Sequence, residues 1–148
     1  MPGRTAQADR LDVRSRLDDL GRVRDFVTAG AGAAGLSADR VGELVLAVDE
    51  AVSNIILHGG APEAAGLEIR IVRDADSVQV HIRDQGRPFD PTLPVDADLG
   101  VSPLERERAG GFGLPLLQRL VDRLDYRRAD DGHNELALIM RRPQPGGG

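Results

Sequence analysis

One long helical repeat constrains the fold of this chain more than any other feature of its sequence. Between Val41 and Ile56, apolar residues recur every three or four positions, which is the spacing of one face of an α-helix. Ser37 precedes this run and can cap the helix through its hydroxyl, and Asp39 adds a favourable charge to the first turn. The helix therefore has one apolar face that must pack against another layer. Its stripe consists of Val41, Leu44, Val45, Val48, Val52, Ile55 and Ile56.

Two polar residues, Glu50 and Asn54, lie late in this helix, within the segment Asp49-Glu-Ala-Val-Ser-Asn54. At about 100° per residue, Glu50 lies nearly opposite the centre of the apolar stripe, and Asn54 lies about 40° from Glu50, one turn further on. The two side chains therefore share one side of the helix. This side is either an ordinary solvated surface or the wall of a cleft, and the helix alone leaves both open.

Two alternating runs, at residues 67–71 and 78–82, predict an antiparallel hairpin with a turn at residues 74–77. Asp84 has the same parity as Val78, Val80 and Ile82, so its carboxylate points to the apolar face if the strand continues that far. A buried carboxylate needs hydrogen-bond donors, and a ligand amino group is one possible source. In the alternative, the strand ends at Arg83 and Asp84 only opens a turn through Gly86.

Shorter patterns complete the arrangement. Residues 11–13 alternate like a strand, helical spacing follows from Leu17 to Val27, and the chain closes with a hairpin around a turn at residues 130–132. Together these segments predict an α/β sandwich. A second helical stripe, with Pro115 in its first turn, consists of Leu116, Leu117, Leu120, Val121 and Leu124.

Two glycine segments can be compared with phosphate-binding loops. Gly30 to Gly35 matches the dinucleotide fingerprint G-x-G-x-x-G, but a helix precedes it where the fingerprint requires a strand, so a flexible helix-to-helix connection is the better reading. The run Gly110-Gly-Phe-Gly113 follows an irregular stretch at residues 92–109 that is typical of a lid or of disorder, and it leads into a helix. Such a run offers backbone N–H groups to phosphates, although glycine runs are also common connectors.

Composition narrows the possible functions. The chain has 148 residues with 41% apolar content, which suits one domain, expected at residues 10–142 between flexible ends at residues 1–9 and 143–148. The net charge of -5 argues against a nucleic-acid partner, and the absence of cysteine excludes disulfides and thiol chemistry. The three histidines show no spacing typical of a metal site. No stretch is apolar enough for a signal peptide or a membrane helix, so we expect a soluble cytoplasmic protein.

Four segments, in this order, resemble the anti-sigma-factor serine/threonine kinases, a branch of the ATPase superfamily that includes gyrase, histidine kinases and mismatch-repair proteins. The resemblance runs from about Leu11 to Arg141. In the second segment, Arg87-Pro88 replaces the last pair of the wider superfamily's Asp-x-Gly-x-Gly, a change that the anti-sigma branch tends to show. The segments are Leu46-Ala-Val-Asp-Glu-Ala-Val-Ser-Asn54 with His58-Gly59, Asp84-Gln-Gly-Arg-Pro-Phe-Asp-Pro91, Gly110-Gly-Phe-Gly-Leu-Pro-Leu-Leu117 and Gly132-His-Asn134.

The resemblance implies a role for each matched position. Asn54 matches the asparagine whose side-chain oxygen helps to hold the Mg²⁺ ion on the ATP phosphates, and Glu50 matches the proposed general base. Asp84 matches the carboxylate that accepts a hydrogen bond from the adenine amino group, and Gly86 matches the glycine that lets the backbone approach the base. The implied phosphate loop consists of Gly111, Phe112, Gly113 and Leu114.

The resemblance also implies an α+β fold, a two-layer α/β sandwich with a mixed, mainly antiparallel sheet and helices on one face. It implies a protein kinase that transfers phosphate from Mg-ATP to a serine or threonine of an anti-anti-sigma protein of the STAS type, and that sequesters a sigma factor. A homodimer is implied by similarity, with no direct nucleic-acid or membrane partner. Two alternatives remain: a non-catalytic nucleotide-binding module that acts by sequestration, and a histidine-kinase fragment, although no helical hairpin bearing a phosphoacceptor histidine precedes the domain.

Overall fold

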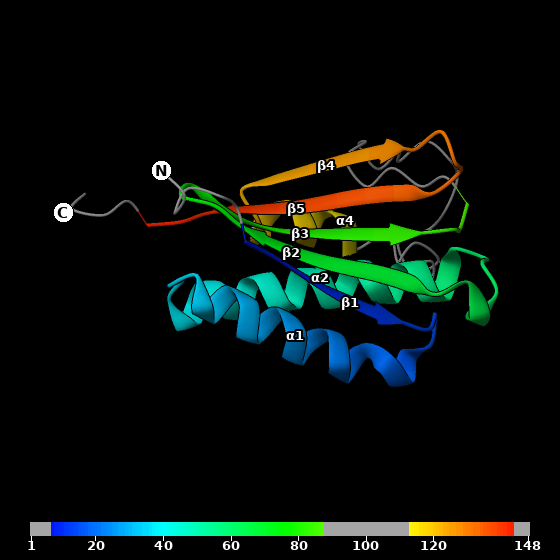
Figure 1. Cartoon of the computed structure of the whole chain (residues 1–148), viewed down its shortest axis with the longest axis horizontal. Helices are drawn as coiled ribbons and strands as arrows, with labels where there is room; N and C mark the ends of the chain where they lie inside the picture. The colour runs from blue at the N-terminus through cyan, green and yellow to red at the C-terminus, as the bar shows by residue number, and fades with distance from the viewer. Residues whose placement is uncertain (1–6, 88–112, 144–148) are drawn as a thin grey trace.

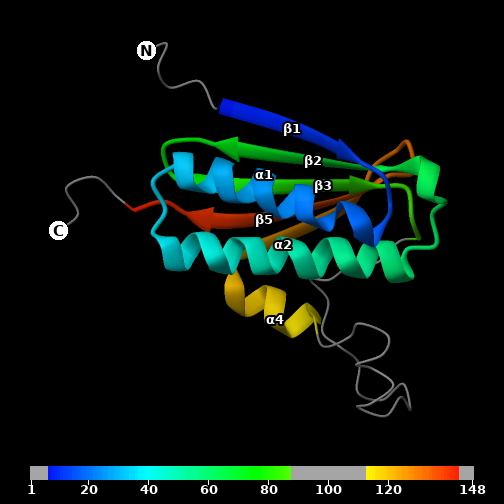
Figure 2. The same ribbon diagram turned by 90° about the horizontal axis from the view of Figure 1, so that it is seen from below.

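The computed structural model describes residues 7–87 and 113–143, and these residues form two layers. One layer is a five-stranded sheet with the strand order β1-β2-β3-β5-β4. The other layer consists of helices that all pack on the same face of the sheet (Figures 1 and 2). The strands are β1 (Gln7–Val13), β2 (Leu67–Arg73), β3 (Ser77–Asp84), β4 (Arg123–Arg128) and β5 (Asn134–Arg141).

The predicted long helix is α2 (Ala38–His58), which lies between α1 (Leu20–Ala33) and α4 (Gly113–Leu120) (Figure 2). Ser37 is its N-cap, and the Ser37 Oγ accepts a hydrogen bond from the Arg40 N–H at 3.2 Å. Single 3₁₀ turns, η2 (Leu17–Asp19) and η3 (Glu63–Ala65), precede α1 and β2.

The core lies between the sheet and the helices, where the predicted apolar faces meet. The central strands bury every second side chain there, and the middle of the α2 stripe is fully buried against them. Because both layers are needed to cover this surface, burial of these side chains is the main term that stabilises the fold. The fully buried side chains include Leu44, Val48, Val52, Ile69, Ile71, Val78, Val80, Ile82, Leu138 and Met140.

The expected α+β class, with two layers and helices on one face, is confirmed. The sheet was expected to be mixed, but all four pairings between described strands are antiparallel. The physical reason lies in the order of the last strands. After the segment that contains α4, the chain enters β4, which runs in the same direction as β3. These two strands would form a parallel pair if they were neighbours, but β5 lies between them and pairs antiparallel with both.

Two predicted boundaries are corrected. Helix α4 ends at Leu120, so Leu124, assigned to its stripe, lies in β4 instead. Asp122 ends the helix because its backbone N–H donates to the Ile139 carbonyl at 3.0 Å, and its carboxylate accepts from the Arg141 N–H at 2.7 Å. At the start of the chain, residues 7–9 were expected to be flexible but belong to β1, where Asp9 pairs with Arg73 at 2.9 Å.

The segment from Gly30 to Gly35 is mostly helix rather than connection. Gly30 and Gly32 lie inside α1, and only Gly35, at φ 82°, belongs to the link to α2. A Cβ atom at Gly30 would lie 2.6 Å from the Cδ1 of Ile71, so glycine lets α1 approach β2 closely. The segment therefore ends a helix and packs against the sheet, and it lacks the strand-to-helix setting of a dinucleotide loop.

Candidate functional site

The ends of β3 and α2 meet at one end of the molecule (Figure 2). The backbone of Gly86 lies against that of Gly59, since a Cβ atom at Gly86 would be only 2.8 Å from the Gly59 carbonyl oxygen. The Arg87 N–H donates to the same carbonyl at 2.8 Å, and the Arg87 guanidinium donates to the His58 carbonyl at 2.7 Å. These contacts hold the turn after β3 against the last residues of the long helix.

Asp84 is the last residue of β3, and its side chain is buried, with 4% of the residue exposed. The carboxylate thus points to the apolar side, as its parity predicts, and the alternative in which the strand ends at Arg83 is wrong. Its Oδ1 accepts hydrogen bonds from the Gly86 N–H at 2.7 Å and from the Asn134 Nδ2 at 3.0 Å. Both of these partners donate, so the carboxylate acts as an acceptor at the mouth of the turn.

Four members of the Asp49-to-Asn54 segment have structural roles. Ala51 and Val52 are buried in the core. Asp49 pairs with Arg24 of α1 at 2.8 Å, and the Ser53 hydroxyl donates to the carbonyl of Asp49 at 2.7 Å.

Within the part of the chain that the structure describes, neither Glu50 nor Asn54 has a side-chain hydrogen bond or ion pair. The helix-wheel prediction that the two share a side of α2 is compatible with this result, because the structural contacts of the segment leave both unused. Both residues are half-buried rather than fully solvated. Helix α2 has α1 on one flank and α4 on the other (Figure 2).

The Asn54 Nδ2 is buried and has no hydrogen-bond partner among the described residues. Leaving a buried amide donor unpaired costs about 1–3 kcal/mol, and an unpaired buried polar group calls for an explanation such as a ligand. An amide presents a donor at one end and a hard oxygen at the other. It therefore suits a site that holds both phosphate oxygens and a metal ion.

The predicted phosphate loop is only partly covered by the structure. Gly111 and Phe112 lie outside the described residues, as does the predicted lid at residues 92–109. Gly113 and Leu114 begin α4, and this start at the last glycine of the run agrees with the predicted loop-to-helix order. The contacts of the Leu114 side chain are likewise outside the described part.

Sequence reasoning assigned no role to three residues that the structure places beside Asp84. Asn134 at the start of β5 bonds to Asp84, Gly86 and Arg87, and Tyr126 and Arg128 of β4 in turn bond to Asn134. The segment Gly132-His-Asn134 was recognised as part of the resemblance, so a signal for Asn134 was present. Nothing in the sequence pattern pointed to Tyr126 or Arg128.

Residues 7–87 and 113–143 contain no cluster of three or more His, Cys, Asp or Glu side chains that could hold a metal ion. None of the helices in these ranges combines the length and the apolar character needed to cross a bilayer.

Residues 13–140 match the profile of the histidine kinase-like ATPase domain. The chain is 39% identical over 98 residues to the serine/threonine-protein kinase BtrW of Bordetella bronchiseptica, a match that covers 64% of this chain and 66% of that protein. It is 29% identical to the serine-protein kinase RsbW of Oceanobacillus iheyensis, with 76% of this chain and 73% of that protein covered. It is 25% identical to an anti-sigma F factor of Thermoanaerobacter, with 78% and 80% covered.

Among solved structures, the fold is similar to a crystal structure of the RsbU and RsbW domains of a Mycobacterium tuberculosis protein. The TM-score is 0.66 at 16% identity, and the match covers 93% of this chain and 34% of that one. The fold, the order of the matched segments and the related proteins agree. The chain belongs to the histidine kinase-like ATPase family, in its branch of anti-sigma-factor serine/threonine kinases.

Proposed function

We propose that this chain is a serine/threonine protein kinase and anti-sigma factor that binds Mg-ATP between the end of β3 and the last turns of α2. The observation that carries the proposal is the buried amide of Asn54, whose Nδ2 has no hydrogen-bond partner among residues 7–87 and 113–143. The C-terminal end of the same helix contacts the Asp84–Gly86 turn. Asn54 lies five residues before Gly59, or about 7.5 Å along the helix axis. Such a separation suits a nucleotide whose base and phosphates contact different ends of one pocket.

Each site residue has one chemical task in this proposal. Asp84 accepts a hydrogen bond from the adenine amino group, and the close backbone contact at Gly86 brings the turn up to the base. Asn54 holds Mg²⁺ through its side-chain oxygen, and the bound ion supplies neutralisation of phosphate charge. The glycine run that ends at Gly113 provides backbone N–H groups for the phosphates.

Glu50 acts as the general base. The hydroxyl oxygen of the acceptor serine or threonine forms a bond to the γ-phosphorus, and the bond from that phosphorus to the bridging oxygen of the β-phosphate breaks. The hydroxyl proton moves to the Glu50 carboxylate, and ADP leaves with the bridging oxygen. Positioning and charge stabilisation supply most of the catalysis of phosphoryl transfer, so few protein groups are required.

The related proteins are named as serine kinases and as an anti-sigma F factor, and this supports a partner switch for the present chain. It sequesters a sigma factor, and it phosphorylates an anti-anti-sigma protein of the STAS type. Phosphorylation releases that protein. A switch that acts on sigma factors works where transcription occurs, so the proposal places the chain in the cytoplasm.

Asn54→Ala is expected to remove the dependence of ATP affinity on Mg²⁺. Calorimetric titration of ATP and ADP, with and without Mg²⁺, should show tighter ATP binding with the ion in the wild type and no gain in the variant, because the hard oxygen ligand is gone. Gln79→Ala is the control. Gln79 lies in β3 on the face of the sheet away from the helices, so this variant should bind both nucleotides as the wild type does. An equal gain in Asn54→Ala would exclude the metal role, and no nucleotide binding by the wild type would exclude the proposed site.

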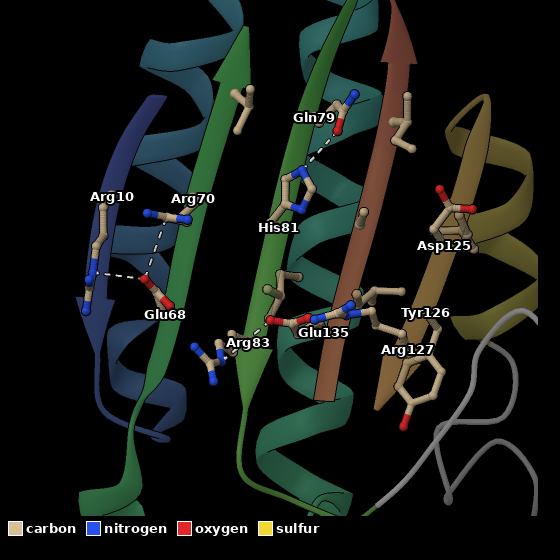
Figure 3. A pocket seen from close by; sticks show the side chains of 16 residues that line it. Arg10, Glu68, Arg70, Gln79, His81, Arg83, Asp125, Tyr126, Arg127 and Glu135 are labelled. Atoms are coloured by element: carbon tan, nitrogen blue, oxygen red, sulfur yellow. Dashed lines mark hydrogen bonds and ion pairs between the residues drawn. The ribbon is translucent and has the colours of Figure 1, made fainter. Parts of the chain in front are cut away.

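Homodimerisation is part of the same proposal, and the face of the sheet away from the helices supports it. This face is hollowed and lined by charged side chains from every strand (Figure 3). One row of residues runs across the strands of this face. It begins with the basic residues Arg10 on β1 and Arg70 on β2, continues through His81 on β3, and ends with the acidic Asp125 on β4. Partial burial lowers the pKa of His81, and the charge of Arg70 lowers it further.

A two-fold axis parallel to the strands would place the β1 edge of one copy over the β4 edge of the other. Arg10 would then face the Asp125 of the second copy, and in the next row Asp12 would face its Arg127. Asp125→Arg is therefore expected to raise the dimer dissociation constant about tenfold or more by placing like charges together, as measured by sedimentation. Arg10→Asp added to Asp125→Arg should restore the dimer. A monomeric wild type, or a dimer that is indifferent to both changes, would contradict this surface.

A further inference from the structure

Asn134 is the centre of a buried hydrogen-bond network beside Asp84. It is the first residue of β5, directly opposite Asp84 in the β3–β5 pairing, and 5% of it is exposed. Its Nδ2 lies 3.0 Å from the Asp84 Oδ1, 2.9 Å from the Arg87 carbonyl oxygen and 3.2 Å from that of Gly86. One amide group therefore contacts the carboxylate and both carbonyls of the following turn.

The opposite end of the same amide is held equally firmly. The Asn134 Oδ1 accepts from the Tyr126 hydroxyl at 2.5 Å and from the Arg128 guanidinium at 3.0 Å, and the same guanidinium nitrogen donates to the Gly86 carbonyl at 2.9 Å. Every neighbour of the nitrogen is an acceptor, and the two neighbours of the oxygen carry donors. The orientation of the amide is therefore fixed by its surroundings, since a flipped amide would lose the three acceptors of its nitrogen and would place its NH₂ group against the donor of Arg128.

This arrangement fixes how Asp84 can receive a ligand. Its Oδ1 already accepts the Gly86 N–H and the Asn134 amide, which together hold the plane of the carboxylate. A side chain that is buried and held by two donors cannot turn to suit a different ligand without breaking both bonds. The acceptor capacity that remains is then held in place on Oδ2, which accepts no hydrogen bond from the described residues.

We propose that Asn134, oriented by Tyr126 and Arg128, is a positioning residue that makes the site selective for 6-amino over 6-oxo purines. The inference rests on the proposed ATP site. A purine with a 6-amino group donates to the fixed carboxylate. A purine with a 6-oxo group presents an oxygen to it, and the two acceptors repel each other, which a rigid site rejects more strongly than an adaptable one.

The test compares ATP with inosine triphosphate, which differs at the 6-position of the base. The wild type is expected to prefer ATP by at least about tenfold, as expected when a charged hydrogen bond is replaced by repulsion. Asn134→Ala should lower this preference several-fold, because Asp84 gains freedom to reorient. Tyr126→Phe removes only the hydroxyl that orients the amide and should lower the preference in the same direction by a smaller factor, with little change in the melting temperature.

A variant that only loosens the fold separates positioning from structural damage. Val80→Ala creates a cavity in β3 at a fully buried position away from the turn, so it should lower the melting temperature and leave the ratio of the two affinities unchanged. Asn134→Ala and Tyr126→Phe with the wild-type ratio would overturn the inference, even if both affinities fall together. A wild type that binds neither nucleotide would instead overturn the proposed function, and this inference with it.

Discussion

Glu50→Gln is expected to lower the rate of phosphoryl transfer by about 10²–10⁴-fold, which is the usual contribution of a general base. Glutamine keeps the size of the side chain but cannot accept the serine proton. ATP affinity should stay close to that of the wild type, because the proposed contacts to base, phosphates and metal come from other residues. Transfer is measured as phosphorylation of a serine-bearing anti-anti-sigma protein, followed by mass spectrometry, and affinity is measured by calorimetry.

Glu43→Gln is a matched control for this experiment. Glu43 lies on the same helix two turns earlier, where it pairs with Arg40 at 3.4 Å, so the same chemical change is made away from the proposed site. This variant should retain full transfer activity. If Glu50→Gln also retained it, Glu50 would not be the base. If the wild type bound ATP but transferred no phosphate to any partner, the non-catalytic sequestering module would be the better description.

Periodicity in the sequence predicted on which faces of their elements the residues of the candidate site lie. The alternation of β3 placed Asp84 on the apolar side, and the 3.6-residue period of α2 separated Glu50 and Asn54 from the stripe that packs on the sheet. Both predictions depend on one element each, so they need no knowledge of tertiary structure. The same reasoning could not show that Asp49 and Ser53 are used structurally, because the pairing of Asp49 with Arg24 depends on how α1 packs against α2.

The network around Asn134 could not be predicted for the same reason. Asn134 lies fifty positions after Asp84, and the two meet only because the β3–β5 register places them directly opposite each other. The end of α4 and the packing of Gly30 against Ile71 also depend on partners that are remote in sequence. Periodicity therefore identifies the face on which a residue lies, whereas hydrogen-bond partners between distant elements follow from register and packing.

Gly86→Ala is expected to destabilise the protein and to weaken ATP binding by about tenfold or more, since the overpacked turn also displaces Asp84. The added Cβ would lie 2.8 Å from the Gly59 carbonyl oxygen, 2.9 Å from the Asp84 Oδ1 and 3.0 Å from the Gly59 Cα. Two of these atoms belong to the backbone and cannot rotate away, so the turn itself has to move. Overpacking of this kind costs about 1–3 kcal/mol of unfolding free energy, which denaturant titration measures.

Gly42→Ala makes the same chemical change in α2, where a Cβ atom would meet nothing within 4 Å. It should stabilise the protein by about 0.5–1 kcal/mol, because alanine is the better helix former, and it should leave ATP affinity unchanged. The two substitutions are thus expected to change the free energy of unfolding in opposite directions. A loss of stability in Gly86→Ala alone could therefore not be explained as a general effect of replacing glycine by alanine. If Gly86→Ala matched Gly42→Ala in both stability and affinity, the close contact between Gly86 and Gly59 would not be what shapes the nucleotide site. If Gly86→Ala lost stability but kept the ATP affinity of the wild type, the contact between Gly86 and Gly59 would stabilise the fold without contributing to nucleotide binding.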